Sequence, residues 1–230
     1  MSKKNNHALI LFVKAPRIGT VKTRLQPELT LEQSLILYRA MVEDLVSQFD
    51  EVNFCDLKIF FHPADAIGEM KDWLGDALDY HPQHGEDLGE KMHHAIAEIL
   101  NQKYKKVALV GSDIPTLDPA TVVRAFASLD DYDVVVGPGA DGGFYLIGMK
   151  QPHPELFEGI AWSSNIVFQQ TIQKVQTRGL DIVQLEKKSD IDTYADVRDL
   201  WDFLTKQNLQ GAFNFKSKMY DVLKQIFETG

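Results

Sequence analysis

The sequence predicts an α/β fold built around one open, mainly parallel sheet. Three short runs are apolar throughout, at residues 8–13, 107–110 and 134–136, as expected of parallel strands covered on both faces. Segments with helical periodicity separate such runs, in the strand–helix–strand order of right-handed crossover connections. Because ligands of open α/β sheets bind outside the carboxyl ends of the strands, the residues after each run are the first candidates for a site.

Length and composition fit one soluble domain. Of the 230 residues, 44% are hydrophobic and 25% charged, which is ordinary for a globular protein. No apolar run approaches the roughly 20 residues that span a bilayer. The charged start has no signal-peptide core behind it, and the single Cys55 excludes an internal disulfide. These features predict a cytoplasmic protein without a membrane partner. The net charge of −9 argues against nucleic-acid binding.

A basic loop follows the first strand, at residues 14–24 (KAPRIGTVKTR). Pro16 and Gly19 exclude a regular packed element, so the cations project from irregular backbone. Side-chain charge and backbone N–H groups together suit phosphate binding. A solvated loop is the alternative, but the acidic background and the place after the first strand favour phosphate. The predicted phosphate-binding residues of this loop are Lys14, Arg17, Gly19, Thr20, Lys22 and Arg24.

Helices and strands then alternate up to residue 100. Thr30-x-x-Gln33 is a capping-box spacing and begins the first helix. A strand is predicted at residues 57–61 and a short helix at residues 66–74. A third, short strand at residues 78–81 leads to another helix.

For that helix, Asp87 and Glu90 supply the cap. Gly85, just before it, indicates a close approach to a ligand. The four histidines in this region lack the i, i+4 helical spacing that would place two imidazoles on one metal. Exposed or hydrogen-bonded histidines are therefore the preferred interpretation: His81, His84, His93 and His94.

The stretch at residues 107–148 is predicted to form the floor of the site. Its first apolar run delivers Ser112 and Asp113 at the carboxyl end. Asp118 followed by proline begins a helix, as an N-cap before an N1 proline. The next run opens into a glycine-rich loop, residues 137–143 (GPGADGG), before a third run at residues 144–147. Asp141 in that loop is either a turn residue or a carboxylate placed for chemistry.

The last third contains two capping signals and a pair of aspartates. Ser163 or Ser164 is expected to cap a helix, and a final strand is predicted at residues 180–185. Asp190 and Asp192 flank Ile191 at that strand's exit, which suits a divalent cation. Thr193-x-x-Asp196 has capping-box spacing, so a purely structural role is equally open for Asp192 and Thr193. The tail, residues 213–227, has one apolar helical face, for packing on the domain or on the partner of a homodimer.

Together these motifs resemble the nucleotide-diphospho-sugar transferase superfamily, with its GT-A-like fold, across roughly residues 8–204. The chain is most similar to a bacterial branch known as domain of unknown function 2064, or transferase 1 associated with radical-SAM and selenium domains. Lys22-Thr-Arg24-Leu and Asp190-Ile-Asp192-Thr also resemble the phosphate loop and the metal-binding motif of 2-phospholactate guanylyltransferases. The branch motifs are Lys14-Ala-Pro-Arg17-x-Gly19-x-Val-Lys22-Thr-Arg24-Leu, Gly111-Ser-Asp113-x-Pro115 and Asp141-Gly-Gly-x-Tyr145-Leu-Ile-Gly148.

The resemblance implies a doubly wound, mostly parallel three-layer sandwich of the Rossmann type, with the nucleotide over its N-terminal half. It implies that Asp113 and Asp192 hold Mg²⁺ or Mn²⁺ against the nucleotide phosphates. We expect one transferase domain at residues 1–207 with a C-terminal helical appendage at residues 208–230. The chain departs from relatives in lacking Gly-Gly-x-x-x-Arg in the first loop and Asp-x-Asp at Asp113. It also departs from the guanylyltransferase acceptor loop at residues 142–145.

The resulting hypothesis is a metal-dependent transferase that moves a nucleotidyl group from a nucleoside triphosphate to a small anionic acceptor, releasing pyrophosphate. The alternatives are glycosyl transfer from a nucleotide-sugar, with Asp141 as base, and a non-catalytic nucleotide-binding module. Besides the basic loop, the predicted site comprises Gly85 and Ser112 for the nucleotide, Lys22, Asp113 and Asp141 for catalysis, Asp113 and Asp192 for the metal, and Gly139, Asp141, Gly142, Gly143, Tyr145 and Trp162 for the acceptor.

Overall fold

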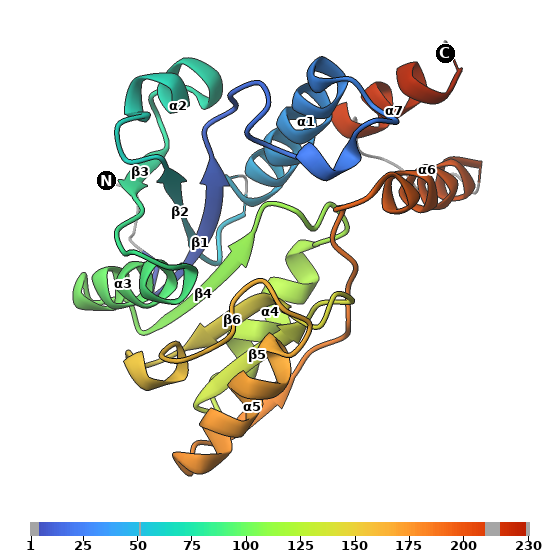
Figure 1. Ribbon diagram of the computed structural model, residues 1–230. Helices are drawn as coiled ribbons and strands as arrows, with labels where there is room; N and C mark the ends of the chain where they lie inside the picture. The colour runs from blue at the N-terminus through green and yellow to red at the C-terminus, as the bar shows by residue number, and fades with distance from the viewer. Residues whose placement is uncertain (1–4, 51, 210–216, 229–230) are drawn as a thin grey trace.

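A seven-stranded sheet forms the centre of the protein (Figure 1). The computed structural model describes residues 5–50, 52–209 and 217–228. The strands are β1 (His7–Lys14), β2 (Asp56–His62), β3 (Asp79–Pro82), β4 (Lys106–Gly111), β5 (Val134–Pro138), β6 (Phe144–Met149) and β7 (Ile182–Gln184). The helices are α1 (Leu31–Asp50), α2 (Ile67–Leu74), α3 (Leu88–Asn101), α4 (Pro119–Ser128), α5 (Val167–Thr177), α6 (Tyr194–Leu209) and α7 (Lys218–Glu228), with 3-10 turns η1 (Thr23–Leu25) and η2 (Pro154–Leu156).

The strand order is β3-β2-β1-β4-β6-β5-β7, and the predicted mostly parallel α/β fold is confirmed. Only β6 runs antiparallel, between β4 and β5. The reason is the short connection from β5, residues 139–143. A hairpin can be closed by so few residues, whereas a parallel crossover needs a dozen or more. The glycine-rich loop is therefore a hairpin turn at the same sheet edge as the carboxyl ends of β1 and β4.

Helices cover both faces of the sheet. On one face α1, α2 and α4 pack on the strands, around Tyr38, Met70 and Phe126. On the other, α3, α5 and η2 pack around Met92, Val175 and Leu156. A third cluster joins α1, α6 and α7 beyond the sheet (Figure 1). The predicted apolar runs in β1, β4 and β5 are thus buried on both faces, which explains their continuously apolar sequences.

Four predicted helix caps are present, including the Thr193 cap of α6, and one is wrong. Thr30 and Gln33 exchange bonds between side chain and backbone N–H, at 3.1 and 2.9 Å. The carboxylates of Asp87 and Asp118 also accept from N–H groups of the first turns of α3 and α4. Neither Ser163 nor Ser164 caps α5, because the chain turns sharply at Ser163 (φ 66°) and the helix begins only at Val167.

The C-terminal helix α7 packs on α1 and α6 of the same chain. Its start is fixed by Asp44 of α1, whose carboxylate accepts from the Ser217 hydroxyl at 2.7 Å and from the Lys218 backbone at 2.9 Å. The predicted tail residues Phe213 and Phe215 lie outside the described residues. The division at residue 207 and the homodimer stay predictions. In the described parts of the chain, no helix is both long and apolar enough to cross a membrane.

Candidate active site

A cavity of about 550 Å³ opens at the carboxyl edge of the sheet, between the ends of β1 and β4. Strand order reverses at this point, since β2 and β3 continue on one side of β1 and β4 lies on the other. Such a switch point is where open α/β sheets bind ligands. Its charged lining residues are Lys14, Lys22, Arg24, Asp113, Asp141 and Asp192.

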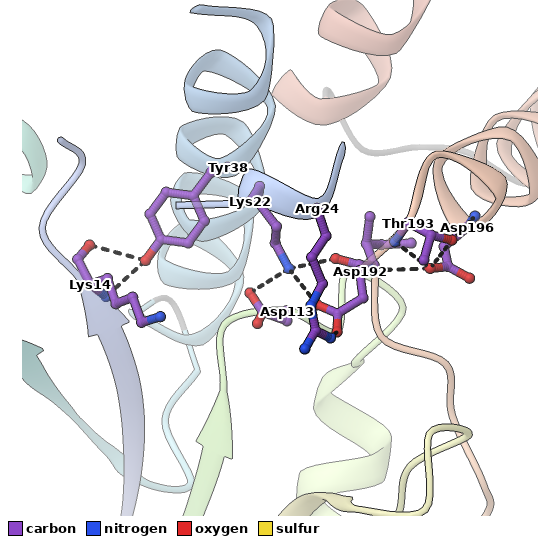
Figure 2. A network of polar contacts seen from close by, with 9 residues as sticks. Lys14, Lys22, Arg24, Tyr38, Asp113, Asp192, Thr193 and Asp196 are labelled. Atoms are coloured by element: carbon purple, nitrogen blue, oxygen red, sulfur yellow. Dashed lines mark hydrogen bonds and ion pairs between the residues drawn. The ribbon is translucent and has the colours of Figure 1, made fainter. Parts of the chain in front are cut away.

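Lys22 lies at the centre of the polar network of this cavity (Figure 2). Its backbone is left-handed (φ 51°, ψ 37°), which is costly for a residue with a Cβ and is commonest at functional sites. Its side chain is only 4% exposed. The ammonium donates to the Ile191 carbonyl at 2.5 Å and lies 2.9 Å from Asp113 and 3.8 Å from Asp192. One buried cation therefore joins two carboxylates that are far apart in sequence.

Local backbone bonds hold these carboxylates in place. The Ile191 N–H donates to the Asp113 carbonyl at 3.0 Å, which ties the end of β4 to the segment before α6. Thr193 and Asp196 form the predicted capping box, with the Thr193 N–H donating to the Asp196 carboxylate at 2.6 Å. Thr193 is thus structural. The Asp192 carboxylate is not used by the cap and turns to Lys22 and to Arg24, 2.8 Å away (Figure 2).

The two carboxylates suit a magnesium-type ion. Both lie around the same ammonium, Asp113 at hydrogen-bonding distance (2.9 Å) and Asp192 at ion-pair distance (3.8 Å). Mg²⁺ is commonly bound by one or two carboxylates together with substrate phosphates and water. The described residues contain no group of three or more His, Cys, Asp or Glu side chains placed for a metal. An ion held by Asp113 and Asp192 would therefore need further oxygens from a bound substrate.

Tyr38 of α1 fixes the start of the basic loop. Its hydroxyl accepts from the Lys14 N–H at 2.8 Å and donates to the Lys14 carbonyl at 3.0 Å (Figure 2). Burial, and then the nearby charge of Asp113, raise the pKa of this phenol, so it stays neutral. The sequence indicates only that Tyr38 belongs to the buried stripe of its helix. Its contact with the loop depends on a partner 24 residues away.

Three residues of the predicted nucleotide group lie away from the cavity. Arg17 does not line it, because its guanidinium bonds Glu69 of α2 at 2.9 and 2.5 Å, with Asp65 at 3.7 Å. Gly19 and Gly85 do not line it either, and both have positive φ, 74° and 136°. These glycines serve turns of the backbone. The predicted residues that do line the cavity are Lys14, Thr20, Lys22, Arg24 and Ser112.

The glycine-rich hairpin places Asp141 in the cavity while holding its carboxylate in a turn. One oxygen accepts from the Gly143 N–H at 2.8 Å, and the carboxylate still lines the cavity. Gly143 lines this cavity as well, whereas Gly139 lines an adjoining hollow. Gly142 does not: its carbonyl accepts from the Phe168 N–H at 2.9 Å, and a Cβ there would collide with the Asn165 carbonyl. Gly142 is therefore a packing residue.

Of the two aromatic residues predicted for the acceptor, Tyr145 presents its ring and not its hydroxyl. That hydroxyl donates to the Glu186 carbonyl at 3.0 Å, and burial raises its pKa to about 12. Trp162 lines the cavity, with its indole seated against Gly89 of α3, where a Cβ would lie only 2.6 Å from the ring. The glycine at the start of α3 thus makes room for the indole.

The sequence pairs Asp190 with Asp192 for a divalent cation, but the predicted site includes only Asp192. Asp190 lines a second hollow of about 450 Å³ that adjoins the first. Burial, and then repulsion from Asp141, raise the pKa of its carboxyl. Leu88, Ser163 and Ser164 line both hollows. The sequence shows the Asp190–Ile191–Asp192 pair, but which carboxylate faces which hollow depends on the turn into α6.

Comparison with known proteins shows the family of the chain. The model of the family described as "Uncharacterized protein conserved in bacteria (DUF2064)" matches residues 45–164. A candidate nucleotide-diphospho-sugar transferase from Desulfovibrio desulfuricans G20 is 34% identical with a TM-score of 0.88, over 96% of this chain and 95% of the other. A comparison with curated proteins gave no match.

Two other solved structures share the fold at low identity. The manganese complex of Rv0371C from Mycobacterium tuberculosis H37Rv is 17% identical, with a TM-score of 0.50 over 86% of this chain and 98% of that one. The 4-diphosphocytidyl-2C-methyl-D-erythritol synthase from Anaerococcus prevotii DSM 20548 is 10% identical, with a TM-score of 0.57 over 87% and 97%. At these identities the likeness concerns the fold alone.

Proposed function

This chain belongs to the DUF2064 family, within the nucleotide-diphospho-sugar transferase superfamily, and from that premise we propose that it is a metal-dependent nucleotidyltransferase. It is a transferase of the nucleotide-using kind. The proposal adds the donor, a nucleoside triphosphate, and the leaving group, pyrophosphate. The observation that carries it is the single network in which Lys22 joins Asp113 and Asp192 inside a cavity that Lys14 and Arg24 also line.

The cations of the basic loop are suited to a triphosphate. Lys14, Lys22 and Arg24 line the cavity and would contact the phosphate oxygens, with the backbone of the loop as a further source of N–H donors. Ser112 lies buried at the floor. Binding of this kind positions the α-phosphorus and neutralises charge, and these two effects supply most of the catalysis in phosphoryl-type transfer.

In the reaction, an acceptor hydroxyl oxygen forms a bond to the α-phosphorus. The bond from that phosphorus to the bridging oxygen breaks, and pyrophosphate leaves with the electron pair. The proton of the acceptor hydroxyl passes to water or to the carboxylate of Asp141, which lines the cavity. Asp113 and Asp192 would hold Mg²⁺ or Mn²⁺, which when bound supplies charge neutralisation at the phosphate oxygens.

Glycosyl transfer from a nucleotide-sugar is the second candidate, favoured by one observation. Asp141 lines the cavity with one oxygen held by the Gly143 N–H, so that the second oxygen is directed by a fixed turn. A carboxylate placed in this way could remove a proton from an acceptor hydroxyl. The two reactions differ in their leaving groups, pyrophosphate from a triphosphate and a nucleoside diphosphate from a sugar donor.

The test measures release of pyrophosphate and of nucleoside diphosphate, with and without Mg²⁺ or Mn²⁺. The donors are four nucleoside triphosphates and the corresponding nucleoside-diphospho-sugars. We expect metal-dependent pyrophosphate release, which Asp113→Asn lowers by about 10²–10³-fold. The matched control is Asp131→Asn, an exposed acid that follows α4 at the opposite edge of the sheet. Release of nucleoside diphosphate alone would favour glycosyl transfer. Metal-dependent nucleotide binding without turnover would favour a binding module.

A further inference from the structure

The two adjoining hollows form one cleft with chemically different ends. They share ten lining residues, including Arg24, Asp113 and Asp141. Lys14 and Lys22 line only the first hollow, whereas Gly139, Asn165 and Asp190 line only the second. We call the first the donor end and the second the acceptor end.

The acceptor end has an excess of carboxylates. Its described lining includes four of them and a single cation, Arg24. Arg24 is already paired with Asp192 at 2.8 Å. Lys188, on the strand-like segment beside the hairpin, turns away and donates to the Thr116 carbonyl at 3.0 Å. The carboxylates are Asp113, Asp141, Asp190 and Asp192. If a metal neutralises Asp113 and Asp192, Asp141 and Asp190 still face the acceptor.

The rest of the acceptor end is apolar or carries neutral polar groups. Leu88 is 45% exposed although it is a large hydrophobic residue. Phe144, which lines both hollows, stands edge-on to Trp162, which lines only the first, with ring centroids 6.3 Å apart. The two rings form an aromatic wall where the hollows adjoin. Ser163 and Ser164 contribute hydroxyls, and Ser163 is held in a left-handed conformation, φ 66°, of the strained kind found at ligand sites.

We propose that the acceptor is a hydroxyl compound with an apolar face and without a phosphate or carboxylate group. This inference rests on the proposed function, because it names the acceptor of that reaction. An anionic group at the acceptor end would meet like charges in a partly enclosed hollow, where such repulsion is stronger than in water. The hydroxyls and the aromatic wall suit a sugar-like or amino-alcohol surface. This proposal differs from the small anionic acceptor expected from sequence.

The first experimental arm measures the electrostatic potential at Trp162, which lines the first hollow and packs against Phe144, a residue of both hollows. It needs no knowledge of the acceptor. In a Trp73→Phe, Trp201→Phe background, Trp162 is the only tryptophan. Its fluorescence is quenched with caesium and with iodide, each normalised to free tryptophanamide. We expect caesium to be favoured by about threefold. Asp190→Asn should reduce that preference and Asp131→Asn should not. Equal or stronger quenching by iodide would overturn the inference.

The second arm compares matched acceptors by pyrophosphate release: glucose, glucosamine and glycerol, each beside its own phosphate ester. We expect kcat/KM to favour the unphosphorylated member of any reactive pair by about tenfold or more. Asp190→Asn should narrow the difference without changing KM for the nucleotide. Preference for a phosphate ester in the unaltered protein overturns the inference. If no triphosphate yields pyrophosphate with any acceptor, while Trp162 still favours caesium, the proposed function fails and the acidic acceptor end stands.

Discussion

Lys22 occupies the position between Asp113 and Asp192 that a divalent cation would need. We therefore predict that Lys22→Met binds Mn²⁺ more tightly than the unaltered protein when no nucleotide is present. In the free protein, the ammonium neutralises both carboxylates, at 2.9 and 3.8 Å. A metal ion must displace it. With Met in its place, the carboxylates are left without that counter-ion and become a stronger site for a cation.

The magnitude follows from these distances. At an effective dielectric of 20, Coulomb's law gives about 4–6 kcal/mol for each contact before desolvation and screening. Asp113 and Asp192 are 45% and 38% exposed, so most of that energy is lost to solvent. We take about 1.4–2 kcal/mol as the remainder, which corresponds to roughly 10–30-fold in the Kd of Mn²⁺. Turnover should fall in the same variant, since the ammonium no longer contacts the phosphates.

The assay is a titration of Mn²⁺ by electron paramagnetic resonance on the protein alone, with folding verified by circular dichroism. Arg17→Met is the matched control, because Arg17 lies in the same loop and pairs with carboxylates outside the cavity. It should leave the Kd unchanged. Lys22→Gln is a second variant with the same expected direction. If both Lys22 variants are folded and bind Mn²⁺ no more tightly, Lys22 does not compete for the metal and the two-carboxylate site is wrong.

Three further predictions concern the hairpin and the lone thiol. Asp141→Asn should keep the turn, because an amide oxygen can still accept from the Gly143 N–H. The Kd of the nucleotide should therefore stay unchanged while kcat falls about 10²-fold. An unchanged kcat would exclude Asp141 as the base. Gly142→Ala should destabilise the fold by about 1–3 kcal/mol in urea unfolding, since φ is 89° and the Cβ meets the Asn165 carbonyl; Gly159→Ala, with positive φ but open space around the Cβ, is the control. Burial raises the pKa of Cys55 to about 12, so a thiol reagent at neutral pH should label it only after unfolding; rapid labelling of the folded protein would contradict its buried placement.

Structure that depends on residues a few positions apart could be predicted from the sequence. Side-chain positions that depend on residues far away in the sequence could not. The capping boxes at Thr30 and Thr193 depend on residues three positions away, so spacing alone identifies them. The sequence assigns both Arg17 and Lys22 to the phosphates. They separate in the structure because Glu69, 52 residues on, holds one outside the cavity, while Ile191, 169 residues on, accepts from the other inside it. The place of β6 beside β4 likewise depends on a partner distant in sequence.

The backbone hydrogen bond between Ile191 and Asp113 keeps the Asp113 and Asp192 carboxylates close to each other even when Lys22 is not between them. If a bound nucleotide draws the ammonium toward its phosphates, the carboxylates lose the cation that bridges them and repel each other. The Ile191 N–H remains bonded to the Asp113 carbonyl at 3.0 Å, and the α6 cap continues to hold the backbone of Asp192. The two side chains therefore stay close after Lys22 leaves. Two neighbouring carboxylates without a counter-ion attract a metal ion more strongly than the neutralised pair does. Nucleotide and metal should accordingly bind with positive cooperativity. Lys22→Met should weaken this cooperativity, because in that variant no ammonium neutralises Asp113 and Asp192 before the nucleotide binds.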